Sequence, residues 1–208
     1  MPRDRTILFV CTGNICRTPV AAGLLYDRLV REQADAQIHI RSAGIWALEG
    51  RPATAYAQQV MGERDMDISA HRARNITQAI VDDADLILVM TRQHADAIRR
   101  GFDRVAGKLH LLAEMAGDGH DVEDPYGGSL AEYRRTAARL DDLIEHGYES
   151  ILKLLNTREP PAHSKEDCPP KAVPSRGAQP CPTTPTSLAG TPPTPGSVRG
   201  VPETDTAQ

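Results

Sequence analysis

The sequence predicts an α/β fold in which a parallel sheet carries helices on both faces. The chain has 208 residues and 40% hydrophobic content, enough to bury one sizeable core. Up to about residue 158, apolar stretches rich in Val, Ile and Leu alternate with stretches in which apolar residues recur at helical spacing. Strands that alternate with helices in this way form a parallel sheet flanked by helices.

Each predicted element follows from a particular stretch of sequence. A first strand ends at Val10, and an amphipathic helix begins near Pro19, since proline is favoured in the first turn of a helix. The predicted strands are RTILFV at 5–10, IHIRSA at 38–43, DLILVM at 85–90 and LHLLAE at 109–114. The predicted helices cover 19–32, 54–63, 95–102 and 130–156.

The composition changes at residue 159. Twelve of the 16 prolines lie between there and the C-terminus, among Ser, Thr and Gly and with few large apolar residues. Such a segment buries too little apolar surface to offset the entropy lost on ordering. We therefore expect a folded domain at 1–158 and a disordered tail at 159–208, whose PPTP spacing suits a spacer or a site for a protein partner.

Composition and cysteine positions exclude several classes of protein. The net charge of −4 argues against a nucleic-acid partner. The apolar run before Cys11 is too short for a signal peptide or a membrane span, and no other stretch reaches that length, so we expect a cytoplasmic protein with no membrane partner. Four cysteines, two in one loop and two in the tail, fit neither a disulfide framework nor a zinc site.

The stretch CTGNICRTP at 11–19 is typical of an anion-binding loop. It lies between the first strand and the first helix, and ligand sites in open α/β sheets lie beyond the carboxyl ends of the strands. Backbone amides at a helix N-terminus, with Gly13 free to adopt unusual dihedral angles, are expected to converge on a phosphate. The loop has neither the lysine nor the spacing of a Walker loop.

Cys11 and Arg17 indicate the chemistry at that phosphate. A helix N-terminus and a nearby cation favour the thiolate form of a cysteine, which is the nucleophilic form. Arg17 lies six residues after Cys11, and its planar guanidinium can bind two phosphate oxygens. A nucleophile beneath a bound phosphoryl group indicates covalent catalysis. The alternative for an isolated Cys-x5-Arg is a buried cysteine in a turn, beside an arginine that faces solvent.

Four motifs in order resemble the low-molecular-weight protein tyrosine phosphatases. They are VCTGNICRTP at 10–19, SAG at 42–44, HRAR at 71–74 and DPYG at 124–127, and the similarity extends over residues 5 to about 156. The resemblance implies a bacterial-type cysteine phosphatase with a four-stranded parallel sheet, which needs no metal or other cofactor. It also implies hydrolysis of phosphotyrosine in proteins through a phosphocysteine intermediate. By analogy alone, bacterial tyrosine kinases of polysaccharide export are candidate substrates.

The resemblance assigns roles to residues of these motifs. Cys11 matches the nucleophile and Arg17 the phosphate-binding arginine. Asn14 matches an asparagine that the family holds in a left-handed conformation, which asparagine tolerates better than most residues. Ser42 and His71 match the residues that hydrogen-bond this asparagine in place.

The remaining loop positions complete the match. Thr18 stands where the family usually has serine, and its hydroxyl is expected to stabilise the thiolate leaving group. Cys16 matches a cysteine that can form a disulfide with the nucleophile and so protect it from irreversible oxidation. The alternative role for Cys16 is that of a small buried packing residue. Thr12, Gly13 and Ile15 supply the other phosphate-loop positions.

Asp124 is expected to be the general acid. The leaving phenolate needs a proton, which a carboxyl group can supply and later take back from water. Asp124 matches the acid of the family's loop, and Asp121 is the alternative if this match is displaced. Tyr126 matches an aromatic residue of the family's pocket wall, and Trp46 falls in a loop that borders the pocket in relatives. With Ile15, whose apolar side chain lies in the loop, Tyr126 suits a flat phenyl ring. Trp46 could equally be a partly buried core residue.

Two other functions are compatible with the same loop. Arsenate reductases share the fold and the Cys-x5-Arg spacing but use two further cysteines, which VDDADLILVM does not supply and which only Cys168 and Cys181 of the tail could replace. The second alternative is a phosphopeptide-binding protein whose catalysis is vestigial. The intact set of Cys11, Arg17 and Asp124 argues against that alternative.

Overall fold

The structure is a computed structural model, and it describes residues 4–34 and 37–157. The disordered tail predicted for 159–208, with Cys168 and Cys181, lies outside the described residues. Among the helices of the described part, none combines the length and the apolar character that a membrane span requires.

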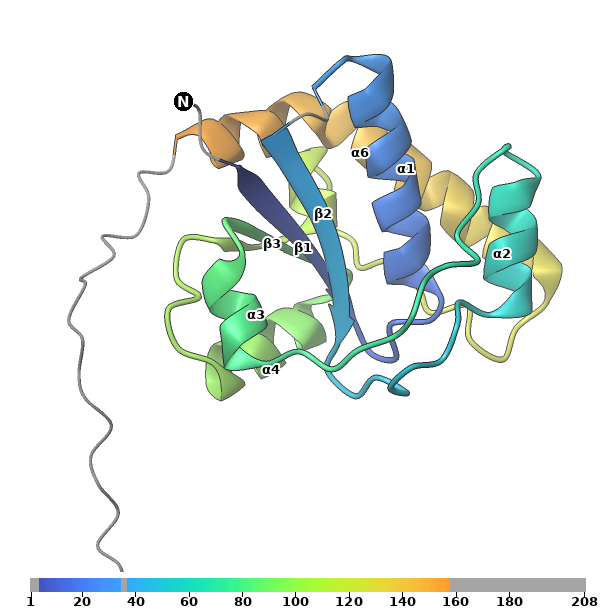
Figure 1. The fold of residues 1–208 in the computed structure, drawn as a ribbon, viewed down its shortest axis with the longest axis horizontal. Helices are drawn as coiled ribbons and strands as arrows, with labels where there is room; N and C mark the ends of the chain where they lie inside the picture. Colours follow the sequence, from blue (N-terminus) through green and yellow to red (C-terminus); the bar gives the residue numbers. More distant parts are fainter. Residues whose placement is uncertain (1–3, 35–36, 158–208) are drawn as a thin grey trace, which may run out of the picture. The chain divides into compact units, whose positions relative to one another are not determined.

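The sheet has four parallel strands, as predicted (Figure 1). The strands are β1 Arg5–Cys11, β2 Ile38–Gly44, β3 Leu86–Val89 and β4 Leu109–Leu111. Their order across the sheet is β2-β1-β3-β4, and each neighbouring pair is parallel. The N-terminal strand β1 is therefore an inner strand of the sheet. The loop that follows it lies at the carboxyl ends of the strands, near the middle of the sheet.

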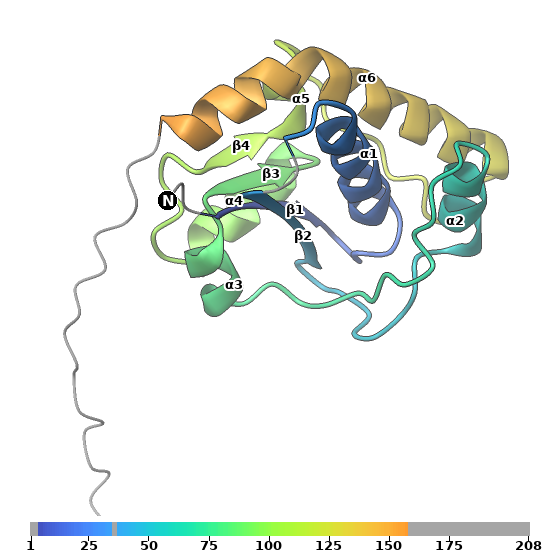
Figure 2. The same ribbon diagram turned by 45° about the horizontal axis from the view of Figure 1, so that its top comes forward.

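Helices cover both faces of this sheet (Figure 2). They are α1 Arg17–Arg31, α2 Ala55–Gly62, α3 Gln78–Asp83, α4 Arg92–Gly101, α5 Leu112–Met115 and α6 Leu130–Asn156. Alternate side chains of β1 point to opposite faces, as the pleat of a strand requires. Ile7 and Phe9 pack in the cluster that includes α1, α2, α5 and α6, whereas Leu8 and Val10 pack in the cluster that includes α3 and α4.

Three details differ from the sequence prediction. The stretch LHLLAE at 109–114 is a strand only as far as Leu111, where α5 begins. The short helix α3 was not predicted, because six residues give little helical periodicity; it begins at the side-chain cap of Thr77. The first helix begins at Arg17 rather than Pro19, and proline is still tolerated there because the first amides of a helix have no intrahelical acceptor.

The carboxyl ends of β1 and β2 are held unusually close together. Cys11 pairs with Gly44 in the parallel register, and a Cβ atom on Gly44 would lie 2.5 Å from the carbonyl oxygen of Thr12. Only glycine allows this approach. The amides of Ile45 and Trp46 donate to the carbonyl oxygens of Cys11 and Thr12. The SAG motif therefore binds the segment after β2 directly to the predicted phosphate loop.

Candidate active site

Residues 11–18, the phosphate loop, run from the end of β1 into the first turn of α1. The N-terminus of α1 is left open, since Cys16 at the N-cap makes no side-chain capping hydrogen bond and the first turn holds no acidic residue. In contrast, Thr54, Thr91 and Ser129 cap α2, α4 and α6. The free amides and the positive end of the α1 dipole thus remain available to an anion.

Asn14 holds the shape of the phosphate loop. It is fully buried and adopts the left-handed conformation, with φ of 55°. Its Nδ2 donates to Thr18 Oγ1 at 2.8 Å and to Ser42 Oγ at 2.9 Å, and its Oδ1 accepts from the backbone amide of Arg74 at 2.9 Å. The left-handed residue is therefore Asn14 and not Gly13, which has no positive φ.

His71 fixes the backbone of the same residue. Its Nε2 lies 2.7 Å from the carbonyl oxygen of Asn14, which can only accept, so Nε2 carries the proton. Burial lowers the pKa of His71, which favours the neutral ring. Both predicted partners, Ser42 and His71, thus contact Asn14 from outside the loop.

Cys11 lies at the floor of a pocket of about 190 Å³. The pocket is lined by Cys11, Thr12, Gly13, Ile15, Cys16, Arg17, Trp46, Leu48, Asp124 and Tyr126. The Cys11 sulfur lies 3.3 Å from Thr18 Oγ1. Because Asn14 already donates to that oxygen, the hydroxyl proton of Thr18 is free to point at the sulfur. A hydroxyl donor in this place stabilises a thiolate.

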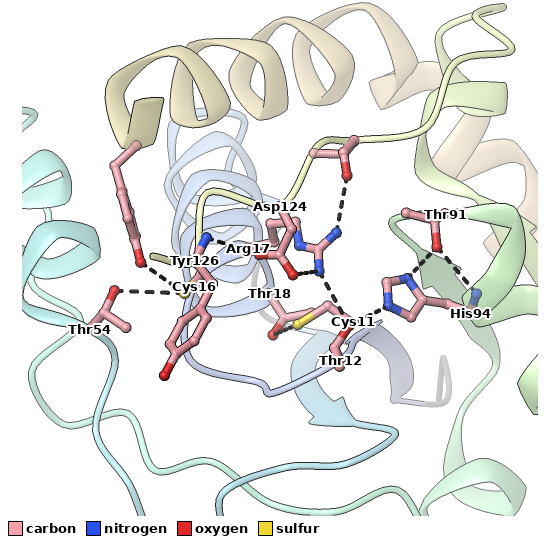
Figure 3. A network of polar contacts seen from close by, with 12 residues as sticks. Cys11, Thr12, Cys16, Arg17, Thr18, Thr54, Thr91, His94, Asp124 and Tyr126 are labelled. Atoms are coloured by element: carbon pink, nitrogen blue, oxygen red, sulfur yellow. Dashed lines mark hydrogen bonds and ion pairs between the residues drawn. The ribbon is translucent and has the colours of Figure 1, made fainter. Parts of the chain in front are cut away.

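Arg17 has its guanidinium buried beside the phosphate loop (Figure 3). Nη1 donates to the carbonyl oxygen of Val122 at 3.1 Å, and Nη2 donates to Asp124 Oδ2 at 2.6 Å and to Thr12 Oγ1 at 3.4 Å. The remaining donor, Nε, is buried and has no hydrogen-bond partner among the described residues. A buried donor without a partner is costly, and an oxyanion in the pocket would satisfy it.

The two candidate acids occupy different places. Asp124 lines the pocket and contacts Arg17. Asp121 lies instead at the start of α4, where its Oδ1 accepts from the backbone amide of Arg92 at 3.0 Å. Asp121 therefore anchors residues 117–128, the acid loop, whereas Asp124 faces the pocket.

The pocket has an apolar wall. Ile15, Trp46, Leu48 and Tyr126 contribute to its lining. Trp46 is 76% exposed and Tyr126 is 65% exposed. Large aromatic side chains left open to solvent around a pocket present flat surfaces to a ligand. Trp46 is thus not a core residue.

Cys16 is buried next to the pocket and contacts groups that the sequence did not indicate. Its sulfur lies 3.2 Å from the Tyr133 hydroxyl and 3.8 Å from Thr54 Oγ1. Burial raises the pKa of the Cys16 thiol, and burial also raises the pKa of Tyr133 to about 12. Cys16 is a free thiol here, so its predicted redox role stays a prediction.

His94 was also missed at the sequence level. It is buried against the phosphate loop, with Nε2 3.0 Å from Thr12 Oγ1 and Nδ1 2.8 Å from Thr91 Oγ1 (Figure 3). The only local signal is its place three residues after the N-cap Thr91, where a side chain can reach back to the cap. Within residues 4–34 and 37–157, no group of three or more His, Cys, Asp or Glu side chains is arranged to hold a metal ion.

A sequence model of the low molecular weight phosphotyrosine protein phosphatases matches residues 6–157. The chain belongs to this family. It is 36% identical over 148 residues to the protein-arginine-phosphatase of Bacillus subtilis (strain 168), an alignment that covers 71% of this chain and 97% of the relative. It is 39% identical over 146 residues to the probable low molecular weight protein-tyrosine-phosphatase EpsP of Ralstonia solanacearum, covering 70% and 92% of the two chains.

The fold agrees with a solved member of the family. The crystal structure of the low molecular weight protein tyrosine phosphatase from T. tengcongensis matches with a TM-score of 0.67 and 36% identity, over 71% of this chain and 99% of that one. The family resemblance and the four-stranded fold expected from the sequence are thus confirmed. Membership in this family makes the chain a phosphatase. One relative is named for phosphoarginine and another for phosphotyrosine, so the names of the relatives do not fix the substrate.

Proposed function

We propose that this chain hydrolyses phosphotyrosine in proteins, and other aryl phosphates, through a phosphocysteine intermediate on Cys11. The observation that carries the proposal is one pocket in which the Cys11 sulfur, the open N-terminus of α1 and the unpartnered Nε of Arg17 lie beside an apolar wall. The first three features suit a phosphoryl group, and the wall suits the ring of its ester.

In the first step, the Cys11 thiolate attacks phosphorus and the bond between phosphorus and the aryl oxygen breaks. Asp124 gives its proton to the departing phenolate. Arg17 binds phosphoryl oxygens through Nε and Nη2, once Nη2 has released Asp124. Binding of the developing charge by fixed donors in a partly dry pocket is the largest expected contribution to the rate.

In the second step, water attacks the phosphorus of the phosphocysteine and the S–P bond breaks. The proton of the water passes to the Asp124 carboxylate, which restores the acid for the next cycle. The sulfur leaves as a thiolate, and the Thr18 hydroxyl at 3.3 Å stabilises it. Inorganic phosphate then leaves, and the enzyme returns to its starting state.

Phosphoarginine is the second candidate substrate, because one relative is a protein-arginine-phosphatase. A substrate guanidinium would need an acceptor in the pocket beyond the phosphate site. Among the residues that line this pocket, the one carboxylate is Asp124, which already contacts Arg17. Ile15 and Trp46 on the wall offer apolar surface instead, which favours the aryl ester.

The test compares the two substrates on one enzyme. Purified protein, with EDTA present, is assayed on a phosphotyrosine peptide and on the matched phosphoarginine peptide, alongside Cys11→Ser and Trp46→Ala. We expect turnover of phosphotyrosine by the wild type, none by Cys11→Ser, and a raised KM with nearly unchanged kcat for Trp46→Ala. Full activity of Cys11→Ser would refute the mechanism, and preferred turnover of phosphoarginine would refute the substrate.

The proposal places the chemistry in residues 1–158. It leaves residues 159–208 as a segment for spacing or for contact with a protein partner, as their composition suggests. A bacterial tyrosine kinase fits the proposed substrate class. A pull-down with Cys11→Ser, followed by detection of phosphotyrosine in the captured protein, tests this class directly.

A further inference from the structure

His94 is a buried titratable group that the proposed reaction does not use. It lies on the first turn of α4 with 6% of its surface exposed, although a histidine on a surface helix is usually solvated. Both ring nitrogens have partners at short distance. A buried polar side chain satisfied at both ends and directed at a phosphate loop is a candidate for a role in positioning.

The contacts of His94 form a chain that ends at Arg17. The Thr91 hydroxyl accepts from the His94 backbone amide at 3.2 Å and also lies 2.8 Å from the ring Nδ1. On the other side of the ring, Nε2 lies 3.0 Å from Thr12 Oγ1. The same Thr12 oxygen accepts from Arg17 Nη2 at 3.4 Å. Four side chains from three elements are therefore connected by consecutive polar contacts (Figure 3).

The ring is suited to this place because it is neutral. Burial first, and then the nearby Arg17 cation, lower the pKa of His94 to about 4, against the opposite effect of Asp124 and Asp121. A neutral imidazole offers one N–H donor and one bare acceptor nitrogen, so it can hold a hydroxyl on each side. A lysine or arginine here would instead repel the Arg17 guanidinium.

The first turn of α4 is itself held in place. The acid loop fixes it through Asp121, which accepts from the Arg92 amide, and through the amide of Val122, which donates to the carbonyl oxygen of Met90 at 2.8 Å. Arg92 also donates from its side chain to the carbonyl oxygen of Gly119. His94 therefore projects from a backbone with little freedom, which is what a positioning residue requires.

We propose that His94 is a positioning residue for Arg17: it fixes the Thr12 hydroxyl, and Thr12 holds the Nη2 edge of the guanidinium toward the phosphate site. This inference rests on the proposed function of the pocket. It predicts that His94 acts on oxyanion binding and turnover through Thr12 alone. A residue that merely filled space would affect stability and would act independently of Thr12.

The experiment is a double-mutant cycle on the full chain. His94→Leu removes both ring contacts at similar volume, and His94→Gln keeps a polar group at the reach of Nε2. Thr12→Val removes the hydroxyl with nearly the same shape, and Thr12→Ser keeps it. His110→Gln, at a half-buried histidine of β4 that does not line the pocket, is the matched control for loss of a histidine. For each variant we measure kcat and KM on p-nitrophenyl phosphate, the Kd of inorganic phosphate by calorimetry, and the melting temperature.

We expect His94→Leu and Thr12→Val each to lower kcat/KM by about tenfold and to weaken phosphate binding several-fold, as a misplaced binding group does. The double variant should be no worse than either single variant, because both changes break the same chain. His94→Gln and Thr12→Ser should recover most of the loss, and His110→Gln should match the wild type.

Losses that multiply in the double variant would overturn the inference, because His94 would then act independently of Thr12. Unchanged phosphate binding in His94→Leu, with only a lower melting temperature, would also overturn it. If His94→Leu does not fold, His94→Ala, which also removes both ring contacts, measured with and without Thr12→Val supplies the same cycle. Phosphate binding is an equilibrium measurement, so it tests His94 even if the wild type proves inactive, an outcome that would refute the proposed function instead.

Discussion

Replacing Asp124 with asparagine tests two roles of this carboxylate, as the general acid and as the partner of Arg17. In the structure its Oδ2 accepts from Arg17 Nη2 at 2.6 Å, and its Oδ1 accepts from the Tyr126 amide at 3.2 Å. Asparagine keeps the size and an acceptor oxygen but has neither a charge nor an acidic proton. The change therefore removes the general acid and also removes the carboxylate that occupies Arg17 before phosphate arrives.

The magnitudes follow from these contacts. Loss of a general acid lowers turnover by about 10²-fold or more. The ion pair joins a buried Arg17 to a carboxylate that is 45% exposed, so its free energy lies near the range of exposed pairs, about 0.2–1 kcal/mol. Since about 1.4 kcal/mol corresponds to a tenfold change, inorganic phosphate should bind up to about fivefold more tightly to Asp124→Asn.

The assay measures kcat on a phosphotyrosine peptide and the competitive inhibition constant of inorganic phosphate. Asp121→Asn is the matched control, because its carboxylate lies three residues away and contacts the Arg92 amide outside the pocket. We expect it to lose far less turnover and to bind phosphate as the wild type does. Weaker phosphate binding by Asp124→Asn, or a larger loss of kcat in Asp121→Asn, would refute the reasoning.

Three further predictions concern stability. Asn14→Ala should lower the free energy of unfolding by about 3 kcal/mol in urea denaturation, since it puts alanine in a left-handed conformation and leaves the buried Ser42 and Thr18 hydroxyls without their donor; a loss below about 1 kcal/mol would contradict it. The ordinary pKa of a histidine is 6.5, and burial lowers the pKa of His94 to about 4 in the folded chain, so the unfolded chain binds the proton first as the pH falls. The free energy of unfolding should therefore drop by up to about 3 kcal/mol between pH 6.5 and 4. The variant His94→Gln should lack this part of the drop. An equal pH dependence in both proteins would show that another group is responsible. A chain that ends at Thr157 should keep the melting temperature and the kinetics on p-nitrophenyl phosphate, because residues 159–208 have few apolar side chains to bury; a melting temperature several degrees lower would show that the domain extends further.

Much of the fold and the centre of the site could be predicted because their determinants are local in sequence. Apolar stretches of Val, Ile and Leu marked all four strands, and their alternation with helical periods implied parallel pairing. The phosphate loop was recognisable because Cys11, the glycine and Arg17 lie within one strand-to-helix turn. The short helices α3 and α5 were not predicted, because each has too few residues to show helical periodicity.

The sequence by itself determined the order of elements and the residues of the phosphate loop, because hydrophobic period and a contiguous motif are local properties of the chain. The resemblance of its motifs to the family added the distant residues Asp124, Ser42 and His71, whereas only the tertiary structure showed their contacts with the loop and added His94. Asp124 meets Arg17 across 107 positions, and His94 meets Thr12 across 82. The contact of His94 with Thr12 depends on the strand order β2-β1-β3-β4, which places the start of α4, after β3, next to the loop after β1, and no local pattern encodes that order. The resemblance already implied a left-handed Asn14, but only the tertiary structure shows what holds it there: its side chain makes three hydrogen bonds, with the Thr18 and Ser42 hydroxyls and the backbone amide of Arg74.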